Sequence, residues 1–488
     1  MKKLCSASKS KVDKFIEFSK REIGLSVSRA FSRRIAASET VVKQLDLSGE
    51  LEGHQGCVNT ISFNSTGDIL VSGSDDKQVI LWDWARNTSK LSYPSGHFDN
   101  IFQAKFMPFS DDRKIVTSSA DGQVRIGHVL ENGDVNTEML GEHILRVHSL
   151  AVEPGSPHIL YSCGEDGFVQ HYDLRSSSVK KLLCCSTFVR NNAHSPWDIR
   201  LNAIVIDPRN PNYFAVGGAD EFARVYDIRK NPSDPKTNSP VDAFCPHHLI
   251  DTKDITITSL AYSNTSELLV SYNDELIYLF QKNTGLGPNP LLLSQEDVGK
   301  LEEPRAYRGH RNFQTVKGVS FFGPNDEYVT SGSDCGHIFM WKKKSAGLVR
   351  VMKGDNDIVN QLESHPHIPL LATSGFENTI KLWAPSSKDI TPLPPDFDEI
   401  LDNNQRGREA HSQARLMRVT PDMDLIRHLL RLHRRQGWEA FGSREGPHDG
   451  DTDASDDDED VGGGAPPGDA NVYGYSDEEG NSRECYVS

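Results

Sequence analysis

The chain of 488 residues has no long apolar run. No stretch reaches the roughly 18 consecutive apolar residues that a membrane-spanning helix needs. The first residues, MKKLCSASKSKVDKF, lack the apolar core of a secretory signal peptide. We therefore expect an intracellular, soluble protein without membrane contact.

Cysteine is scarce and poorly placed for metal binding. The eight cysteines are scattered, only Cys184 and Cys185 are adjacent, and no CxxC or Cys/His spacing suits zinc. We expect reduced thiols in the core. No Gly-rich phosphate loop or nucleophile elbow stands in a fitting context. The sequence therefore predicts no catalytic residue, no metal and no cofactor, and it indicates a binding platform rather than an enzyme.

Basic residues are fewer than acidic residues, and the excess of negative charge is unevenly distributed along the chain. The net charge is −16. Residues 449–488 hold thirteen Asp and Glu but only one basic residue, whereas residues 1–50 carry a net charge of +5. The middle of the chain is left with −9, which argues against direct nucleic-acid binding by a folded domain there.

What the sequence does contain is a repeated unit. Residues 53–84 show three short segments of period-2 alternation between turn residues, from a Gly-His opening to a Trp-Asp ending. This pattern resembles the WD-repeat unit. Six more copies align on an acidic turn residue, at spacings of 45, 45, 54, 54, 60 and 43 residues. The seven anchors are Asp76, Asp121, Asp166, Asp220, Asp274, Asp334 and Glu377. One unit cannot bury both of its faces, so seven copies predict an all-β, seven-bladed WD-repeat β-propeller.

The other segments are expected to flank this propeller, which should span residues 41–385. Residues 1–40 read as a basic, partly helical arm in which Phe15 and Ile16 lie on one side of a helix. Residues 40–47 alternate like a strand and are predicted to complete the last blade. Beyond it we expect a linker at 386–419, an amphipathic helix at 420–436 and a disordered acidic tail at 443–488.

Polar residues within the copies are expected to be structural. In WD repeats, a turn His, a strand Ser, the anchor Asp and a Trp form a buried hydrogen-bonded chain. In the first copy these would be His54, Ser72 or Ser74, Asp76 and Trp82. The sixth copy has the matching residues His310, Asp334 and Trp341. Each lost bond would cost about 1–3 kcal/mol, because its partner is left buried and unpaired.

Two neighbouring copies end in an arginine that the first copy lacks. The third copy ends in YDLR, with Asp173 and Arg175, and the fourth in YDIR, with Asp227 and Arg229. In a propeller both arginines would emerge on the same rim of adjacent blades. Each is either a partner-binding hot spot or half of a local surface ion pair worth only ~0–1 kcal/mol. The spacing leaves both interpretations open.

The YDLR and YDIR endings resemble the double WDxR box of the WD-repeat substrate receptors of cullin-4 RING ubiquitin ligases. Longer phrases, such as FAVGGADEFARVYDIRK and HPHIPLLATSGFENTIKLWAP, resemble the same family, over about residues 41–385. The resemblance implies a non-catalytic receptor. It would dock on the propeller adaptor of the ligase and present protein substrates, whose identity the sequence does not reveal, for ubiquitin transfer.

Position by position, the resemblance makes Asp173, Arg175, Asp227 and Arg229 the adaptor-binding residues. The helix with Phe15 and Ile16 resembles, more loosely, the helical docking element of some of these receptors. Tyrosine replaces the Trp of the box in both copies. We expect the protein in the nucleus and cytoplasm. The alternative is a WD-repeat scaffold in a chromatin or signalling complex unrelated to the ligase.

Overall fold

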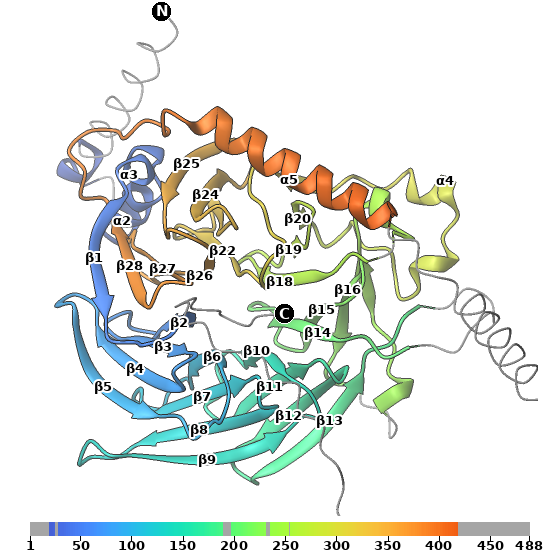
Figure 1. The fold of residues 1–488 in the computed structure, drawn as a ribbon, viewed down its shortest axis with the longest axis horizontal. Coiled ribbons are helices and arrows are strands. Elements are labelled where there is room, and N and C mark those ends of the chain that lie inside the picture. Colours follow the sequence, from blue (N-terminus) through green and yellow to red (C-terminus); the bar gives the residue numbers. More distant parts are fainter. Residues whose placement is uncertain (1–18, 25–27, 189–196, 231–234, 253, 418–488) are drawn as a thin grey trace, which may run out of the picture. The chain divides into compact units, whose positions relative to one another are not determined.

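The computed structural model of the protein describes residues 19–24, 28–188, 197–230, 235–252 and 254–417. The chain divides into one unit of Met1–Ser412 with Cys485–Ser488 and a second of Gln413–Glu484, and nearly all described residues belong to the first. The strands of the first unit form seven antiparallel four-stranded sheets, arranged as the blades of a closed ring (Figure 1). The all-β, seven-bladed fold is therefore confirmed.

The blades follow the chain in order. The first blade contains β2 (Val58–Phe63), β3 (Leu70–Ser74), β4 (Gln78–Asp83) and β5 (Thr88–Pro94). The second contains β6 (Ile101–Phe106), β7 (Lys114–Ser119), β8 (Gln123–Val129) and β9 (Val135–Glu142). The third contains β10 (Val147–Val152), β11 (Ile159–Gly164), β12 (Phe168–Asp173) and β13 (Ser178–Cys184). The fourth contains β14 (Leu201–Ile206), β15 (Tyr213–Gly218), β16 (Ala223–Asp227) and β17 (Asp242–Phe244).

The last three blades complete the ring. The fifth contains β18 (Ile257–Tyr262), β19 (Leu268–Tyr272), β20 (Ile277–Phe280) and β21 (Arg305–Tyr307). The sixth contains β22 (Val319–Phe322), β23 (Tyr328–Ser331), β24 (His337–Lys342) and β25 (Leu348–Lys353). The seventh contains β26 (Val359–Ser364), β27 (Leu371–Gly375), β28 (Thr379–Ala384) and β1 (Asp46–Glu52).

Burial explains which residues each strand uses. Second strands such as β3 and β15 are buried along almost their whole length, because neighbouring blades cover both faces of the sheet. Fourth strands such as β5 and β9 lie at the outside of the ring and are mostly exposed. The first strands lie next to one another around the centre, where β2 contacts both β6 and β26. This arrangement places the turns, where binding residues are expected, at the two ends of the ring.

Closure of the ring corrects one sequence prediction. The strand that completes the seventh blade is β1, which pairs with β28 through contacts such as Leu51 with Ile380. It starts at Asp46, whereas residues 40–43 of the predicted strand belong to the helix α3 (Glu39–Lys43). Ser38 caps this helix by accepting a hydrogen bond from Val41 N at 3.4 Å. A strand before the first copy does complete the seventh blade, as predicted, but it begins several residues later than the predicted strand.

The N-terminal arm is partly helical, in agreement with the sequence. Helix α2 (Ser28–Ala36) carries Arg33 and Arg34 in its last turn, and α3 follows it. Tyr328 donates a hydrogen bond from its hydroxyl to Ala37 O at 3.0 Å, and Arg33 donates to Asn325 Oδ1 at 2.7 Å. The arm is thereby attached to the turn between β22 and β23.

A long helix corrects the predicted linker. Within residues 386–419, α5 (Phe397–Met417) forms and its apolar residues Phe397, Ile400 and Leu401 pack against the core of the sixth blade. Figure 1 shows α5 crossing beside β24 and β25. The other helices are short: α4 (Gln295–Val298) and the 3-10 turns Pro235–Thr237, His247–Leu249 and Pro290–Leu292. The predicted helix at 420–436 and the acidic tail lie outside the described residues.

Most of the described cysteines match the expected reduced state. Thiols that form no disulfide occur at Cys163, Cys184, Cys185, Cys245 and Cys335. Cys57 departs from the expectation because it is disulfide-bonded.

Candidate functional site

Antiparallel pairing sends the first and third strands of each blade in the same direction. They therefore end at the same edge of the ring, which we call the third-strand rim. The rim carries the segments that follow β12 and β16, and the first residues of these segments include the two arginines singled out in the sequence. The opposite edge carries the turns with the acidic anchors.

Asp173 and Arg175 form a bidentate pair on this rim. Arg175 donates from Nε to Asp173 Oδ1 at 3.0 Å and from Nη2 to Oδ2 at 2.8 Å, and its backbone N–H also reaches Oδ1 at 3.0 Å. The Arg175 side chain is 63% exposed. Hydrogen bonds from Arg175 lower the pKa of Asp173 to about 2, so this carboxylate is charged throughout the physiological range.

Asp227 and Arg229 repeat the same geometry on the next blade. Arg229 donates from Nε to Asp227 Oδ1 at 2.9 Å and from Nη2 to Oδ2 at 2.7 Å, with its side chain 61% exposed. Its guanidinium carbon lies 5.9 Å from the centre of the Tyr213 ring. Hydrogen bonding to Arg229 lowers the pKa of Asp227. Two matched, pre-oriented guanidinium groups thus face solvent on neighbouring blades.

A third pair of this kind was missed in the sequence. In the first blade, Arg86 donates from Nη1 to Asp83 Oδ2 at 2.8 Å, although it lies one residue further from its Asp than in the YDxR endings. Its side chain is 80% exposed. A search that allowed one extra residue after the Asp would have found it.

The predicted docking helix is only partly visible. Phe15 and Ile16 lie outside the described residues. The nearby part of the arm contacts the third-strand rim at the sixth blade, where Glu39 and Lys342 form an ion pair at 2.6 Å. The arm therefore shares this rim with the two arginines.

The buried network of the first blade has the arrangement expected for a WD repeat. His54 lies 2.8 Å from Asp76 Oδ2 through Nδ1 and 2.7 Å from Ser72 Oγ through Nε2, and Trp82 Nε1 donates to the same Oγ at 2.8 Å. Ser72, rather than Ser74, is the strand serine. His97 and His143 make equivalent contacts with their anchors Asp121 and Asp166.

The fourth blade uses a different solution. Asp220 is bound by Arg224, which donates from Nη1 to Oδ1 at 2.8 Å and is almost fully buried. The opening residues of this copy lie in a segment outside the described ranges. Arg224 stands in the buried strand ARVYD. A charged residue in a strand that is otherwise mostly apolar could have indicated from the sequence that Arg224 has an acidic partner.

The sixth blade contradicts the predicted network of His310, Asp334 and Trp341. Trp341 Nε1 donates to Arg308 O at 2.9 Å, and Asp334 forms an ion pair with the buried Lys317. His310 is completely buried, and neither ring nitrogen has a hydrogen-bond partner in the structure.

Helix α5 accounts for this difference. Asn404 donates from Nδ2 to Gly309 O at 2.8 Å, and Arg408 donates to His310 O. The helix therefore binds the backbone of the turn that opens the sixth blade, and Lys317 takes the place of a histidine beside Asp334.

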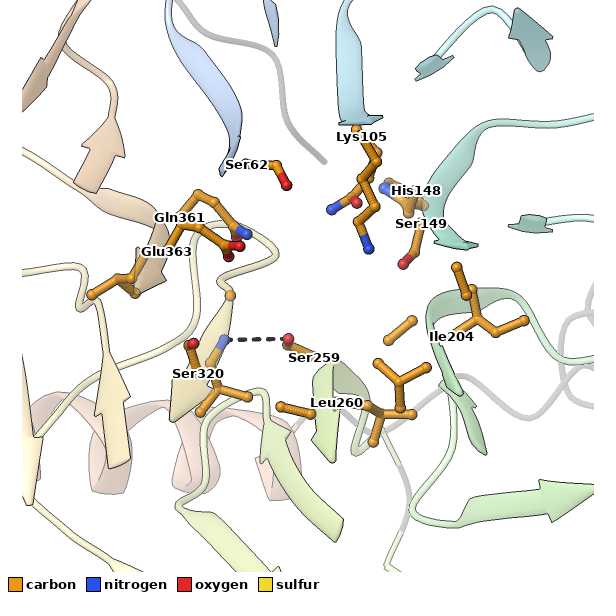
Figure 2. A pocket seen from close by; sticks show the side chains of 18 of the residues that line it. Ser62, Lys105, His148, Ser149, Ile204, Ser259, Leu260, Ser320, Gln361 and Glu363 are labelled. Atoms are coloured by element: carbon orange, nitrogen blue, oxygen red, sulfur yellow. Dashed lines mark hydrogen bonds between the residues drawn. The ribbon is translucent and has the colours of Figure 1, made fainter. Parts of the chain in front are cut away.

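The central channel is a second concave surface. It has a volume of about 460 Å³ and is lined by the first strands of the blades. Figure 2 shows the Lys105 and Glu363 side chains extending into it, from β6 and β26. Lys105 donates from Nζ to Leu150 O at 2.7 Å, and burial raises the pKa of Glu363 to about 7. The sequence analysis did not single out Lys105 or Glu363, although each lies in the first strand of its copy.

The described residues contain no group of three or more His, Cys, Asp or Glu side chains suited to a metal ion. Among the same residues, no helix is long and apolar enough to cross a membrane.

Comparison with known proteins agrees with this architecture. The family model described as "WD domain, G-beta repeat" matches residues 45–83, 302–342 and 347–384. The human "WD and tetratricopeptide repeats protein 1" is 30% identical over 632 aligned positions, which cover 80% of this chain and 92% of that protein. The chain belongs to the WD-repeat family. No catalytic family is indicated by these matches.

Two further relatives are matched over a shorter part of this chain. "DDB1- and CUL4-associated factor 6" of Mus musculus is 34% identical over 271 residues, 54% of this chain and 30% of that protein. "Protein ALTERED SEED GERMINATION 2" of Arabidopsis thaliana is 33% identical over 290 residues, 53% of this chain and 38% of that protein. The WD-repeat chain thus spans only about a third of the length of these two relatives.

Proposed function

We propose that this WD-repeat protein is a non-catalytic substrate receptor of a cullin-4 RING ubiquitin ligase. Its propeller docks on the propeller adaptor of the ligase through Asp173, Arg175, Asp227 and Arg229, and another surface recruits proteins for ubiquitination. Among the receptors of this kind, the long sequence phrases most resemble cullin-4-associated factor eight in a plant-type form. The protein acts in the nucleus and cytoplasm, without direct contact to nucleic acid.

The observation that carries this proposal is the repetition of one Asp–Arg geometry on adjacent blades. Within each guanidinium, the Asp accepts only from Nε and Nη2, so the outer edge of the group remains available for further hydrogen bonds. A side chain already held in place loses little conformational entropy on binding. The name of the mouse relative, which refers to DDB1 and CUL4, supports the same partner for this chain.

The alternative is a scaffold for a chromatin or signalling complex that does not involve the ligase. The name of the human relative favours this reading, because it refers only to WD and tetratricopeptide repeats. Under this alternative, the two Asp–Arg pairs are local surface ion pairs worth ~0–1 kcal/mol each.

Capture of the cullin-4 adaptor distinguishes the two functions. The full chain is purified from cells as wild type, as Arg175→Ala plus Arg229→Ala, and as Arg86→Ala. We expect wild type and Arg86→Ala to recover the adaptor equally. The double variant should lose it, because an interface hot spot contributes roughly 2 kcal/mol or more.

Arg86→Ala is the matched control, since it removes another exposed, Asp-paired arginine from a blade that is not part of the double box. Equal recovery by the double variant would refute the proposed docking residues. Failure of wild type to recover the adaptor would favour the scaffold function.

A further inference from the structure

A pocket opens on the third-strand rim between the fourth and fifth blades. Its volume is about 160 Å³. The residues used below lie where strands of these two blades begin or end: Asp207, Tyr213, Asp242, Phe244, Tyr262 and Phe280. The pocket shares Tyr262 with the lining of the central channel, and neither of the two rim arginines lines it.

Aromatic side chains form much of the pocket wall. Phe244 and Phe280 are buried and lie with their ring centres 5.6 Å apart. Tyr213 and Tyr262 are partly buried and contribute to the same lining. Aromatic rings attract cations to their faces, and they also pack well against aliphatic chains.

Two carboxylates give the pocket a negative charge. Asp242 Oδ1 accepts hydrogen bonds from Ala243 N at 2.9 Å and Gly287 N at 2.7 Å. Asp207 Oδ1 accepts from Ser266 Oγ at 2.8 Å and from Arg209 N at 2.9 Å. All four donors are neutral groups.

No basic side chain of the described residues neutralises these carboxylates. Neither Asp207 nor Asp242 forms an ion pair with a described lysine or arginine. Lys282 also lines the pocket, but it is exposed and forms no ion pair with a described carboxylate. Burial raises the pKa of Asp242, as expected for a carboxyl group that lacks a cationic neighbour. The pocket therefore combines aromatic groups with two acidic groups that are not ion-paired with a described basic side chain.

We propose that this pocket receives a lysine or arginine side chain of the protein that docks on the third-strand rim. The aliphatic stem packs between the aromatic residues, and the cationic head meets Asp207 and Asp242. Tyr213 links the two surfaces, since it lines the pocket and also lies beneath Arg229. The inference rests on the proposed function in one respect: the adaptor bound by Arg229 is also the source of the basic side chain.

The pocket chemistry is tested first without the adaptor. Saturation-transfer NMR measures binding of N-acetyl-lysine N-methylamide, its arginine counterpart and the uncharged norleucine counterpart to the full chain. We expect binding of one or both cationic probes and about tenfold weaker binding of norleucine. Asp242→Asn should abolish this preference. It retains the Oδ1 acceptor for Gly287 N, so its fold is preserved, while Glu131→Gln at an exposed carboxylate leaves binding unchanged.

Adaptor capture then separates the inference from the proposed function. Asp242→Asn should reduce adaptor recovery, as should the double arginine variant. If only the arginine variant loses the adaptor, the docking proposal stands, and the proposal that a basic side chain of the adaptor occupies the pocket is wrong. If no probe binds, or norleucine binds as well as lysine, the pocket assignment is wrong whatever the adaptor does.

Discussion

Two histidines at equivalent positions have opposite surroundings. His54 links Asp76 and Ser72 through its two ring nitrogens. His310 is equally buried, but neither of its ring nitrogens has a partner in the structure. The histidine of the first blade therefore stabilises the fold through hydrogen bonds, whereas the unpaired ring nitrogens of the histidine in the sixth blade lower its stability.

Replacement of each histidine by leucine should reveal this difference. His54→Leu leaves Asp76 and Ser72 without their partner and should lower the free energy of unfolding by about 1–3 kcal/mol. His310→Leu removes an unsatisfied ring and should be close to neutral or stabilising. Urea unfolding monitored by tryptophan fluorescence measures both. Equal losses in the two variants would contradict the different hydrogen bonding.

The same histidine predicts a dependence of stability on pH. Burial, with repulsion from Arg408 and Lys317, lowers the pKa of His310 from 6.5 to about 3. Above the higher value, the ring is neutral in the folded and unfolded chain, and its contribution is constant. As the pH falls below it, the unfolded chain binds the proton first, so the folded state loses stability.

This loss should be absent from His310→Leu. Between about pH 7.5 and pH 5, we expect the free energy of unfolding of the wild type to fall by on the order of 2 kcal/mol more than that of the variant. Urea titrations of both proteins across this range measure the difference. Parallel pH profiles would show that His310 is hydrated or paired in solution.

At the scale of elements, α5 is the part that most changes the basic repeat. Its residues Ile400 and Leu401 extend the core of the sixth blade, and Asn404 binds the turn at Gly309. Ile400 is 9% exposed. The helix therefore belongs to the folded propeller unit rather than to a linker.

Truncation of Ile400 should destabilise the propeller. Ile400→Ala is expected to cost about 2–4 kcal/mol, because it removes packing and leaves a cavity. Gln405→Ala on the exposed side, where the side chain donates a hydrogen bond to Glu409, should change stability by less than about 0.5 kcal/mol. Thermal unfolding followed by circular dichroism compares the two. A similar melting temperature for both variants would show that α5 detaches in solution.

The sequence revealed the repeats because each blade keeps its own turn and strand pattern. It missed α5 because the segment is mostly polar, although Phe397, Ile400 and Leu401 follow helical spacing. It placed the closing strand too early because two adjacent valines, 41 and 42, suit a capped helix as well as a strand. The sequence therefore predicts the structure of a segment whose pattern fits one type of element. It does not predict which of two adjacent elements, helix or strand, takes a segment that fits both.

The candidate site shows the same division. Asp173, Arg175, Asp227 and Arg229 were readable because each pair lies within one short turn. The predicted hydrogen bonds of His310 are absent from the sixth blade. Arg408, which is distant in sequence, donates to His310 O and reaches this turn because α5 packs against the blade. The pocket beside Tyr213 combines residues from two blades, so no single repeat contains its pattern.

At the scale of the whole ring, stability depends on the pairing of its two ends. In β1, Leu51 is buried together with Ile80 of the first blade and Ile380 of the seventh. This strand joins the beginning of the propeller to its end, and it removes the free edge that β28 would otherwise expose. Opening this pair leaves the first and seventh blades each with a neighbour on one side only, and it should reduce the coupling between the blades.

Disruption of β1 should therefore abolish cooperative unfolding. Leu51→Asp places a carboxylate in an apolar cluster at a cost of several kcal/mol, and it leaves the rest of β1 in place. We expect the single calorimetric transition to become broad and to move to lower temperature, with loss of amide protection first in β28 and β2. Glu52→Gln, at an exposed neighbouring position, should leave the transition unchanged. A sharp, unshifted transition for Leu51→Asp would mean that the blades hold the ring together without this clamp.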